Sequence, residues 1–224
     1  MSTPTRRYDS STRQADAQSR RLAIIEAAAR LFRDKGYAET TIANVAAEAG
    51  VSAQLIYAAF NGKAGLLAGV LDRLAAGDDE QILMRDRPES LALADITDPY
   101  ERMRAAAAQV ADLNARVGPF VKLVDQVAGS DPAVAELHAQ MLANMREDHL
   151  VIAERLTRGM RPDLGLERVA DMTRVITGVQ VWHGLVVEGG YTQQQYADWL
   201  GDALIRLLVL DVPNKPMGRR TRAS

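Results

Sequence analysis

Histidine and carboxylate side chains are the residues of this chain whose spacing first suggests chemistry. The pairs Glu136–His138 and Glu147–His149 each lie two positions apart, whereas di-iron helical bundles use Glu-x-x-His pairs, three positions apart. His138 and His149 are 11 residues apart, or about 16 Å along a helix, which is too far for a shared metal. The absence of Cys excludes disulfides, iron–sulfur clusters and thiolate zinc sites.

Motifs that carry catalysis or cofactors are missing from the sequence as well. There is no HExxH, no GxSxG, no Walker phosphate loop and no Rossmann glycine pattern. We therefore expect no enzyme activity and no resident cofactor or metal. No apolar run approaches the roughly 18 residues of a membrane span, and the N-terminus has no apolar signal region. These observations predict a cytoplasmic protein that does not contact membranes.

Charge is distributed unevenly along the chain. Residues 1–74 carry 10 basic and 7 acidic side chains, residues 75–210 carry 13 and 21, and residues 211–224 carry 4 and 1. A basic head on an acidic body suggests that the head meets an anion, although an excess of three charges is also compatible with ordinary scatter. The basic tail, residues 211–224, has no apolar periodicity and is expected to be disordered.

Hydrophobic periodicity and capping signals predict an all-α chain of about nine helices. After a disordered arm at residues 1–16, a first helix ends at Gly36 as its C′ residue. Helices at 42–49 and about 52–59 follow, the latter with Leu55, Ile56 and Phe60 inward, and a fourth helix runs from Lys63 to about Met84. These boundaries predict a three-helix domain over residues 17–64 and a six-helix domain over residues 65–210.

The second domain contains several Pro and Gly signals. Residues 87–97 are expected to form a loop or broken turn. A helix that begins at Pro99 is expected to be interrupted by Gly118-Pro119 and followed by a short helix. Three further helices are expected over 132–158, 167–188 and 192–209, the last opened by a capping box at Thr192.

Two short helices joined by a glycine turn are the geometry of a helix-turn-helix. The second helix must enter the major groove, so it has to be slim and present small or polar side chains outward. The outward candidates are Ser52, Ala53, Gln54, Tyr57 and Ala58.

The segment from Arg21 to Leu66 resembles the DNA-binding domain of the TetR family of bacterial transcriptional regulators. The helical remainder resembles the effector and dimerisation domain of that family in architecture. The residues that carry the resemblance are Ile24-Ile25, Ala28, Leu31-Phe32, Gly36-Tyr37, Thr40-Thr41, Val45-Ala46, Ala49-Gly50-Val51-Ser52, Leu55-Ile56-Tyr57, Phe60, Lys63 and Leu66.

The resemblance implies DNA-binding roles for Thr41, Ser52, Ala53, Gln54, Tyr57 and Lys63. Because Ala58 lacks a phosphate contact that is common in the family, Arg21 is expected to contact the DNA backbone or minor groove instead. Thr41 and Ser52 would offer a hydroxyl and backbone N–H groups to phosphates, or would serve as helix caps only. Gln54, where the family often has Gly, would face base edges and can form two hydrogen bonds to adenine. Tyr57 and Lys63 would contact phosphates; the alternatives are a packed tyrosine and a solvated lysine.

The helices expected at 167–188 and 192–209 are apolar on two sides, and each side must be buried. One side can face the core of the chain and the other a second copy, or both can lie inside a thick monomeric bundle. A short recognition helix reads only a few base pairs, so the homodimer on a palindromic double-stranded DNA operator is favoured. The interface candidates are Val175, Val179, Trp182, Val186, Trp199, Ala203 and Leu207.

A transcriptional regulator responds to a signal, and the resemblance implies a cavity that binds a small-molecule effector. Met and aromatic side chains suit an irregular apolar cavity, although such residues are also ordinary core. The candidates are Met103, Phe120, Leu123, Val127, Met141, Met145, His149 and Trp182. We expect a homodimeric repressor that an apolar or amphipathic effector releases from DNA. The alternative is a helical ligand- or protein-binding module whose basic head binds DNA without sequence preference.

Overall fold

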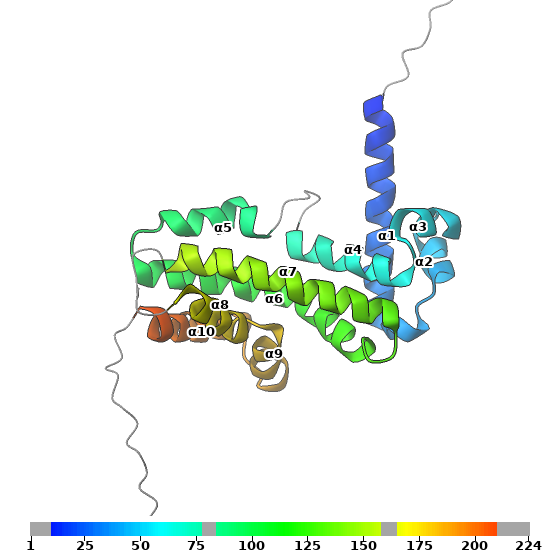
Figure 1. Cartoon of the computed structure of the whole chain (residues 1–224). Helices are drawn as coiled ribbons and strands as arrows, with labels where there is room; N and C mark the ends of the chain where they lie inside the picture. Colours follow the sequence, from blue (N-terminus) through cyan, green and yellow to red (C-terminus); the bar gives the residue numbers. More distant parts are fainter. Residues whose placement is uncertain (1–9, 78–83, 158–164, 210–224) are drawn as a thin grey trace, which may run out of the picture. The chain divides into compact units, whose positions relative to one another are not determined.

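The structure is a computed structural model that describes residues 10–77, 84–157 and 165–209, and those residues form an all-α fold without a β-strand. This confirms the predicted fold class. The helices labelled in Figure 1 are α1 (Ser10–Glu39), α2 (Ile42–Ala49), α3 (Ala53–Phe60), α4 (Lys63–Ala76), α5 (Pro88–Ala92), α6 (Pro99–Val127), α7 (Pro132–Leu156), α8 (Leu166–Ile176), α9 (Val179–Trp182) and α10 (Gln193–Leu208).

The first helix is longer than the sequence suggested. It begins at Ser10, so residues 10–16 of the expected disordered arm are helical. The helical backbone breaks at Gly36, the predicted C′ glycine (φ 76°), and α1 then continues to Glu39. Residues 1–9 and the tail at 211–224 lie outside the described residues.

The chain divides into two compact units. Unit 1 consists of Met1–Arg87 and Asp112–Asp148, and unit 2 consists of Pro88–Ala111 and His149–Ser224. Helices α6 and α7 each contribute residues to both units. The boundary expected near residue 64 falls inside unit 1, because Leu66 and Leu67 of α4 are fully buried in the same core as α1.

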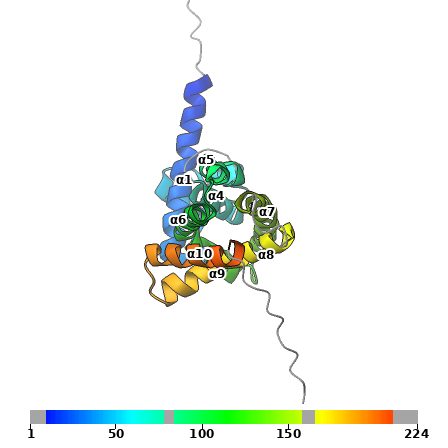
Figure 2. The same ribbon diagram turned by 90° about the vertical axis from the view of Figure 1, so that its left-hand side faces the viewer.

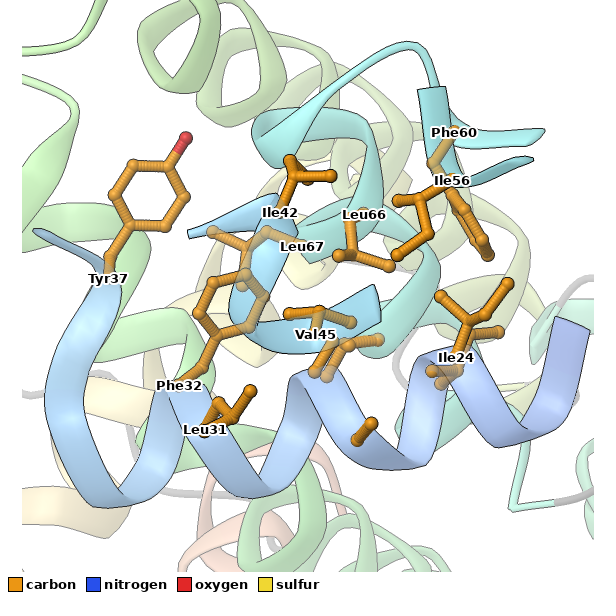
Figure 3. Close-up of a cluster of buried hydrophobic side chains, with 14 of the residues drawn as sticks. Ile24, Leu31, Phe32, Tyr37, Ile42, Val45, Ile56, Phe60, Leu66 and Leu67 are labelled. Carbon is orange, nitrogen blue, oxygen red and sulfur yellow. The ribbon is translucent and has the colours of Figure 1, made fainter. Parts of the chain in front are cut away.

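In unit 1, α1 packs against α2 and α4, and α3 packs against both α2 and α4 (Figure 1). The shared core is apolar and combines side chains from all four helices with Phe120, Val124 and Val134 of α6 and α7. Figure 3 shows Phe32 of α1 beside Val45 of α2, with Ile56 and Phe60 of α3 at the opposite end of the cluster. An eight-residue helix such as α3 is not stable by itself, so this core holds it in place.

Gly65 permits the close approach of α3 and α4. A Cβ at this position would overlap the main-chain carbonyl oxygen of Phe60, the last residue of α3. Gly69, one turn later, lies against the Phe60 ring, where a Cβ would stand 2.9 Å from the nearest ring carbon. The two glycines therefore let the first turns of α4 lie directly on the end of α3.

In unit 2, α10 lies beside α8 and beside the π-helix η3 (His183–Glu188) (Figure 2). Tyr196 and Leu200 of α10 and Met103 of α6 are fully buried. Thr192 opens α10 with the predicted capping box: its Oγ1 accepts from the Gln195 N–H at 3.2 Å, and its own N–H donates to Gln195 Oε1 at 2.8 Å.

The expected break of α6 at Gly118-Pro119 is wrong, because α6 continues through Pro119 to Val127. Proline removes one backbone hydrogen bond from a helix. Pro119 itself faces solvent, whereas Val117 and Phe120 beside it are buried. The burial of the apolar side of the helix therefore outweighs the lost hydrogen bond.

The single helix expected over 167–188 is also wrong, because α8 ends at Ile176 and α9 begins at Val179. The hydroxyl of Thr177 donates to the Thr173 carbonyl at 2.8 Å, a contact that tends to bend helices. Gly178 is extended (φ −64°, ψ 151°), and a Cβ there would stand 3.2 Å from the Arg174 carbonyl oxygen. Glycine thus accommodates the break, and a π-helix follows α9.

Two smaller differences concern the segment between α4 and α6. Helix α4 ends at Ala76, where Gly77 adopts a left-handed C-cap, rather than near Met84; residues 78–83 are outside the described part. The segment 87–97, expected as a loop or broken turn, contains the five-residue helix α5 and a short 3-10 turn, Leu93–Asp95. Pro88 is a favourable first helical residue, and the burial of Leu93 anchors the turn.

Candidate nucleic-acid interface

Thr41 begins α2 as its N-cap. Its Oγ1 accepts a hydrogen bond from the Asn44 N–H at 3.1 Å, and Asn44 Oδ1 accepts from the Thr41 N–H at 3.4 Å. The Thr41 hydroxyl also donates to Asn44 Oδ1 at 2.7 Å. Thr41 is exposed, so the start of α2 presents a polar surface and the positive end of the helix dipole to solvent.

Ser52 has the same position at the start of α3. Its Oγ accepts from the Leu55 N–H at 3.2 Å, and the side chain is exposed. The turn before it depends on Gly50, which has a left-handed backbone (φ 66°) and donates its N–H toward the Ala46 and Ala47 carbonyls. Both predicted caps are therefore formed, and each leaves its helix N-terminus open to an anion.

Helix α3 has one buried side and one open side. Ile56 and Phe60 are buried in the core, whereas Gln54 and Ala58 are exposed and Ala53 is half-buried. Tyr57 is 58% exposed, which agrees with an outward role rather than the alternative of a packed tyrosine. The open side of α3 therefore presents an amide, a phenol and a methyl group to solvent, and these are side chains that can face a major groove.

Leu55 was expected to point inward, and that expectation is wrong. It is 38% exposed although its neighbour Ile56 is fully buried. Successive residues of a helix are rotated by about 100°, and the core covers α3 on one side only. The sequence pattern could not separate the two positions because both residues are branched and apolar.

Arg21 is held against the end of α3. Its guanidinium group lies 4.3 Å from the centre of the Phe60 ring, and Nη1 donates to the Ala59 carbonyl at 3.4 Å. The residue is exposed. Arg21 thus ties α1 to the C-terminus of the candidate recognition helix, and a contact with DNA remains a prediction.

Lys63 is held within the fold. Its Nζ donates to the Tyr37 carbonyl at 2.9 Å and lies 4.1 Å from the centre of the Tyr37 ring. Burial lowers the pKa of this ammonium group, and the negative charge of Asp131 opposes that shift. Lys63 is therefore neither a freely solvated lysine nor fully available to a phosphate in this conformation.

Tyr37 connects the DNA-binding helices to the start of α7. Its side chain is only 5% exposed and is stacked on Phe32, and its hydroxyl points away from the core cluster (Figure 3). The hydroxyl donates to Asp131 Oδ2 at 3.2 Å, while Asp131 Oδ1 accepts from the Ala133 N–H at 2.9 Å. One carboxylate thus joins the end of α1 to the first turn of α7.

The connection through Asp131 was not foreseen. The sequence marked Asp131-Pro132 as the start of a helix, and that prediction is confirmed by α7. Nothing local in the sequence indicated that the second oxygen of the carboxylate meets a tyrosine 94 positions earlier. A buried Tyr needs a partner for its hydroxyl, and that requirement is the available signal.

The residues predicted to bind an effector are divided between the two units. Phe120 is buried in the core of unit 1, and Leu123, Val127 and Met141 pack against that core; Met145 is half-buried. The other candidates are in unit 2, where Met103 is fully buried and Trp182 nearly so. His149 Nε2 lies 3.3 Å from Thr177 Oγ1.

The predicted interface residues all belong to unit 2, and they differ in exposure. Val175 is 62% exposed, whereas Val179 and Trp182 are buried within the unit. The half-buried members are Val186, Trp199, Ala203 and Leu207. Within the described part of the chain, no three His, Asp, Glu or Cys side chains are close enough to hold a metal ion.

The comparisons with known proteins agree with this geometry. The family model for bacterial regulatory proteins of the tetR family matches residues 24–70. The HTH-type transcriptional regulator TtgR of Pseudomonas putida is 33% identical over 163 residues, which cover 69% of this chain and 75% of TtgR. The chain belongs to the TetR family. This TetR-family chain is thus a DNA-binding transcriptional regulator.

Solved structures of TetR-like fold extend over both units. NalD, described as the secondary repressor of the MexAB-OprM multidrug efflux pump in Pseudomonas aeruginosa, has a TM-score of 0.65 at 20% identity and covers 88% of this chain and 98% of its own. A SmeT–triclosan complex has a TM-score of 0.62 at 20% identity, with coverages of 86% and 93%. At these identities the likeness concerns the fold. Among the described helices of this TetR-family chain, none is both long and apolar enough to cross a membrane.

Proposed function

We propose that this TetR-family regulator is a homodimeric repressor that binds a palindromic operator and leaves it when a small apolar or amphipathic effector binds. It would act in the cytoplasm, where bacterial DNA lies, without enzymatic activity or a resident cofactor. The observation that carries the proposal is the solvent-exposed side of α3, together with Thr41 and Ser52, which cap two exposed helix starts. NalD, named as a repressor, supports the sign of regulation.

The DNA-binding part is tested with the purified full chain and labelled DNA from upstream of its own gene, compared with shuffled DNA across a salt series. Specific binding is expected to exceed nonspecific binding by at least about 10³ and to persist as the salt concentration rises. Equal affinities for the upstream and the shuffled DNA, both falling as the salt concentration rises, would refute sequence-specific binding. They would favour an N-terminal domain that binds DNA by charge alone. Reporter expression from the same promoter then distinguishes repression from activation.

The homodimer is proposed on the exposed apolar surface of unit 2. Val175 on α8 and Val187 on η3 are 62% and 56% exposed, and exposed valines lose contact with water when a second copy covers them. A two-fold dimer also supplies the second recognition helix that a palindrome requires. Sedimentation velocity at micromolar concentration should give twice the mass of 24.4 kDa; a monomer at that concentration would refute the dimer.

The effector is proposed to bind in unit 2 near Trp182. The indole Nε1 of Trp182 is buried and has no hydrogen-bond partner among the described residues, and a buried donor without an acceptor is costly. An amphipathic effector with one acceptor would satisfy it. Because Trp182 and Trp199 are the two tryptophans of the chain, titration with triclosan, the ligand named with SmeT, can be followed by fluorescence. A change in wild type that Trp182→Phe abolishes is expected; an equal change in both proteins would refute the site.

A further inference from the structure

Helix α3 exposes the apolar side chain of Leu55 on the side that would face the bases if the helix entered a major groove. Leu55 is 38% exposed, and it lies on the side of α3 that also presents Gln54 and Ala58. The opposite side, with Ile56 and Phe60, is buried in the core. Leu55 is thus not a partly buried core residue, because the core packs against the other side of the helix.

The chemical composition of α3 limits what it can read. Its sequence, AQLIYAAF, contains no Arg or Lys, and these are the side chains that most often recognise guanine in the major groove. Gln54 is the one side-chain amide. The other exposed side chains of α3 are Leu55, Tyr57, Ala58 and Ala59, so apart from the Tyr57 ring its exposed apolar groups are methyl groups. The apolar feature of the major groove is the C5-methyl group of thymine.

We propose that Leu55 reads the C5-methyl group of thymine in each half of the operator, with Ala58 small enough to let α3 approach the groove floor. This inference rests on the proposed function, since it requires α3 to enter a major groove. Leu55 becomes a specificity-determining residue, and the contacted base pair is an A·T pair whose thymine faces it. Contact with one methyl group is worth about a fourfold change in affinity.

The test begins with DNA that the wild-type full chain enriches from a randomised duplex pool. Each thymine of one half-site is then replaced by uracil, which differs only by lacking the methyl group, and affinity is measured by fluorescence anisotropy. At one or two positions, uracil should lower wild-type affinity by about fourfold. Leu55→Ala should bind the thymine DNA at least that much more weakly and show no further loss with uracil.

Two variants make the comparison decisive. Leu55→Met keeps an apolar side chain and should retain the sensitivity to uracil. Leu142→Ala removes a leucine that is 51% exposed on α7, and it should match wild type on both DNAs. Unchanged melting curves for all variants would show that the exposed positions leave the fold intact.

The outcomes separate this inference from the function on which it rests. An enriched sequence whose affinity is insensitive to uracil at every position would overturn the role of Leu55 and leave sequence-specific binding established. Leu55→Ala that keeps the full sensitivity to uracil would overturn it as well. Failure of the wild type to enrich any sequence would instead overturn the proposed function.

Discussion

Removal of the Tyr37 hydroxyl is expected to weaken the attachment of α7 to the DNA-binding helices. Tyr37→Phe deletes one oxygen from a ring that is 5% exposed, and it removes the donor that lies 3.2 Å from Asp131 Oδ2. A hydrogen bond to a charged group contributes about 1.5–3 kcal/mol. This one is long, and Asp131 keeps its contact with the Ala133 N–H, so we expect a loss of about 1–2 kcal/mol in the free energy of unfolding.

Urea unfolding followed by circular dichroism, together with thermal melting, measures this loss. For a chain of this size, 1 kcal/mol lowers Tm by about 2–4 °C. Tyr100→Phe is the matched control, because Tyr100 is 45% exposed, and it should stay within about 0.5 kcal/mol of wild type. Asp131→Ser should retain a helix cap but lose the oxygen that Tyr37 contacts.

A double-mutant cycle decides whether the two side chains act as a pair. The double variant Tyr37→Phe, Asp131→Ser should have the same free energy of unfolding as the less stable of the two single variants. Either change alone already removes the shared hydrogen bond, so the second change has no bond left to remove. Additive losses from the two single changes, or a Tyr37→Phe variant as stable as wild type, would refute the reasoning.

The burial of Tyr37 beside Asp131 also predicts a pH dependence of stability at alkaline pH. Burial, and then the negative charge of Asp131, raise the pKa of Tyr37 in the folded chain. The folded state therefore favours the neutral phenol, and the stabilisation is complete below the unfolded pKa of about 10 and decreases as pH rises above it. The stability of wild type should fall more steeply above that pH than the stability of Tyr37→Phe. Parallel profiles would contradict the assignment.

Three further variants test other contacts by urea unfolding or sedimentation. Gly65→Ala places a Cβ on the Phe60 carbonyl and should cost about 1–3 kcal/mol, whereas Gly129→Ala, which meets no atom within 4 Å, should be neutral; equal stabilities would refute the contact. Thr192→Ala removes the cap of α10 and should cost about 1 kcal/mol, with Thr192→Ser as the variant that restores it. Val175→Asp should raise the dimer dissociation constant at least tenfold without changing monomer stability; an unaltered dimer would place the interface elsewhere.

The DNA-binding helices could be predicted from the sequence because local signals define them. Thr41 caps the start of α2 and Gly50 caps its end, and the predicted bounds of 42–49 are confirmed. Ser52 similarly marks the start of α3. Caps and left-handed glycines act through neighbouring backbone atoms, so their effect does not depend on the rest of the fold.

The features that escaped prediction depend on contacts between distant residues. Pro119 normally ends a helix, but the burial of Phe120 in the core of unit 1 keeps α6 continuous. The sequence gives no sign of the break at Gly178, because apolar residues continue at helical spacing on both sides of this glycine. The exposure of Leu55 and the bond between Tyr37 and Asp131 likewise follow from which elements pack together, which no short stretch of sequence records.

The division of α3 into a buried and an open side has a consequence for how this regulator evolves. Residues that hold the helix, Ile56 and Phe60 together with Gly65 of α4, are constrained by the core. Residues on the open side can change with little loss of stability, because exposed positions tolerate substitution. A duplicated copy of the gene can therefore acquire a new operator through substitutions on the open side of α3, while the inherited core keeps the fold stable.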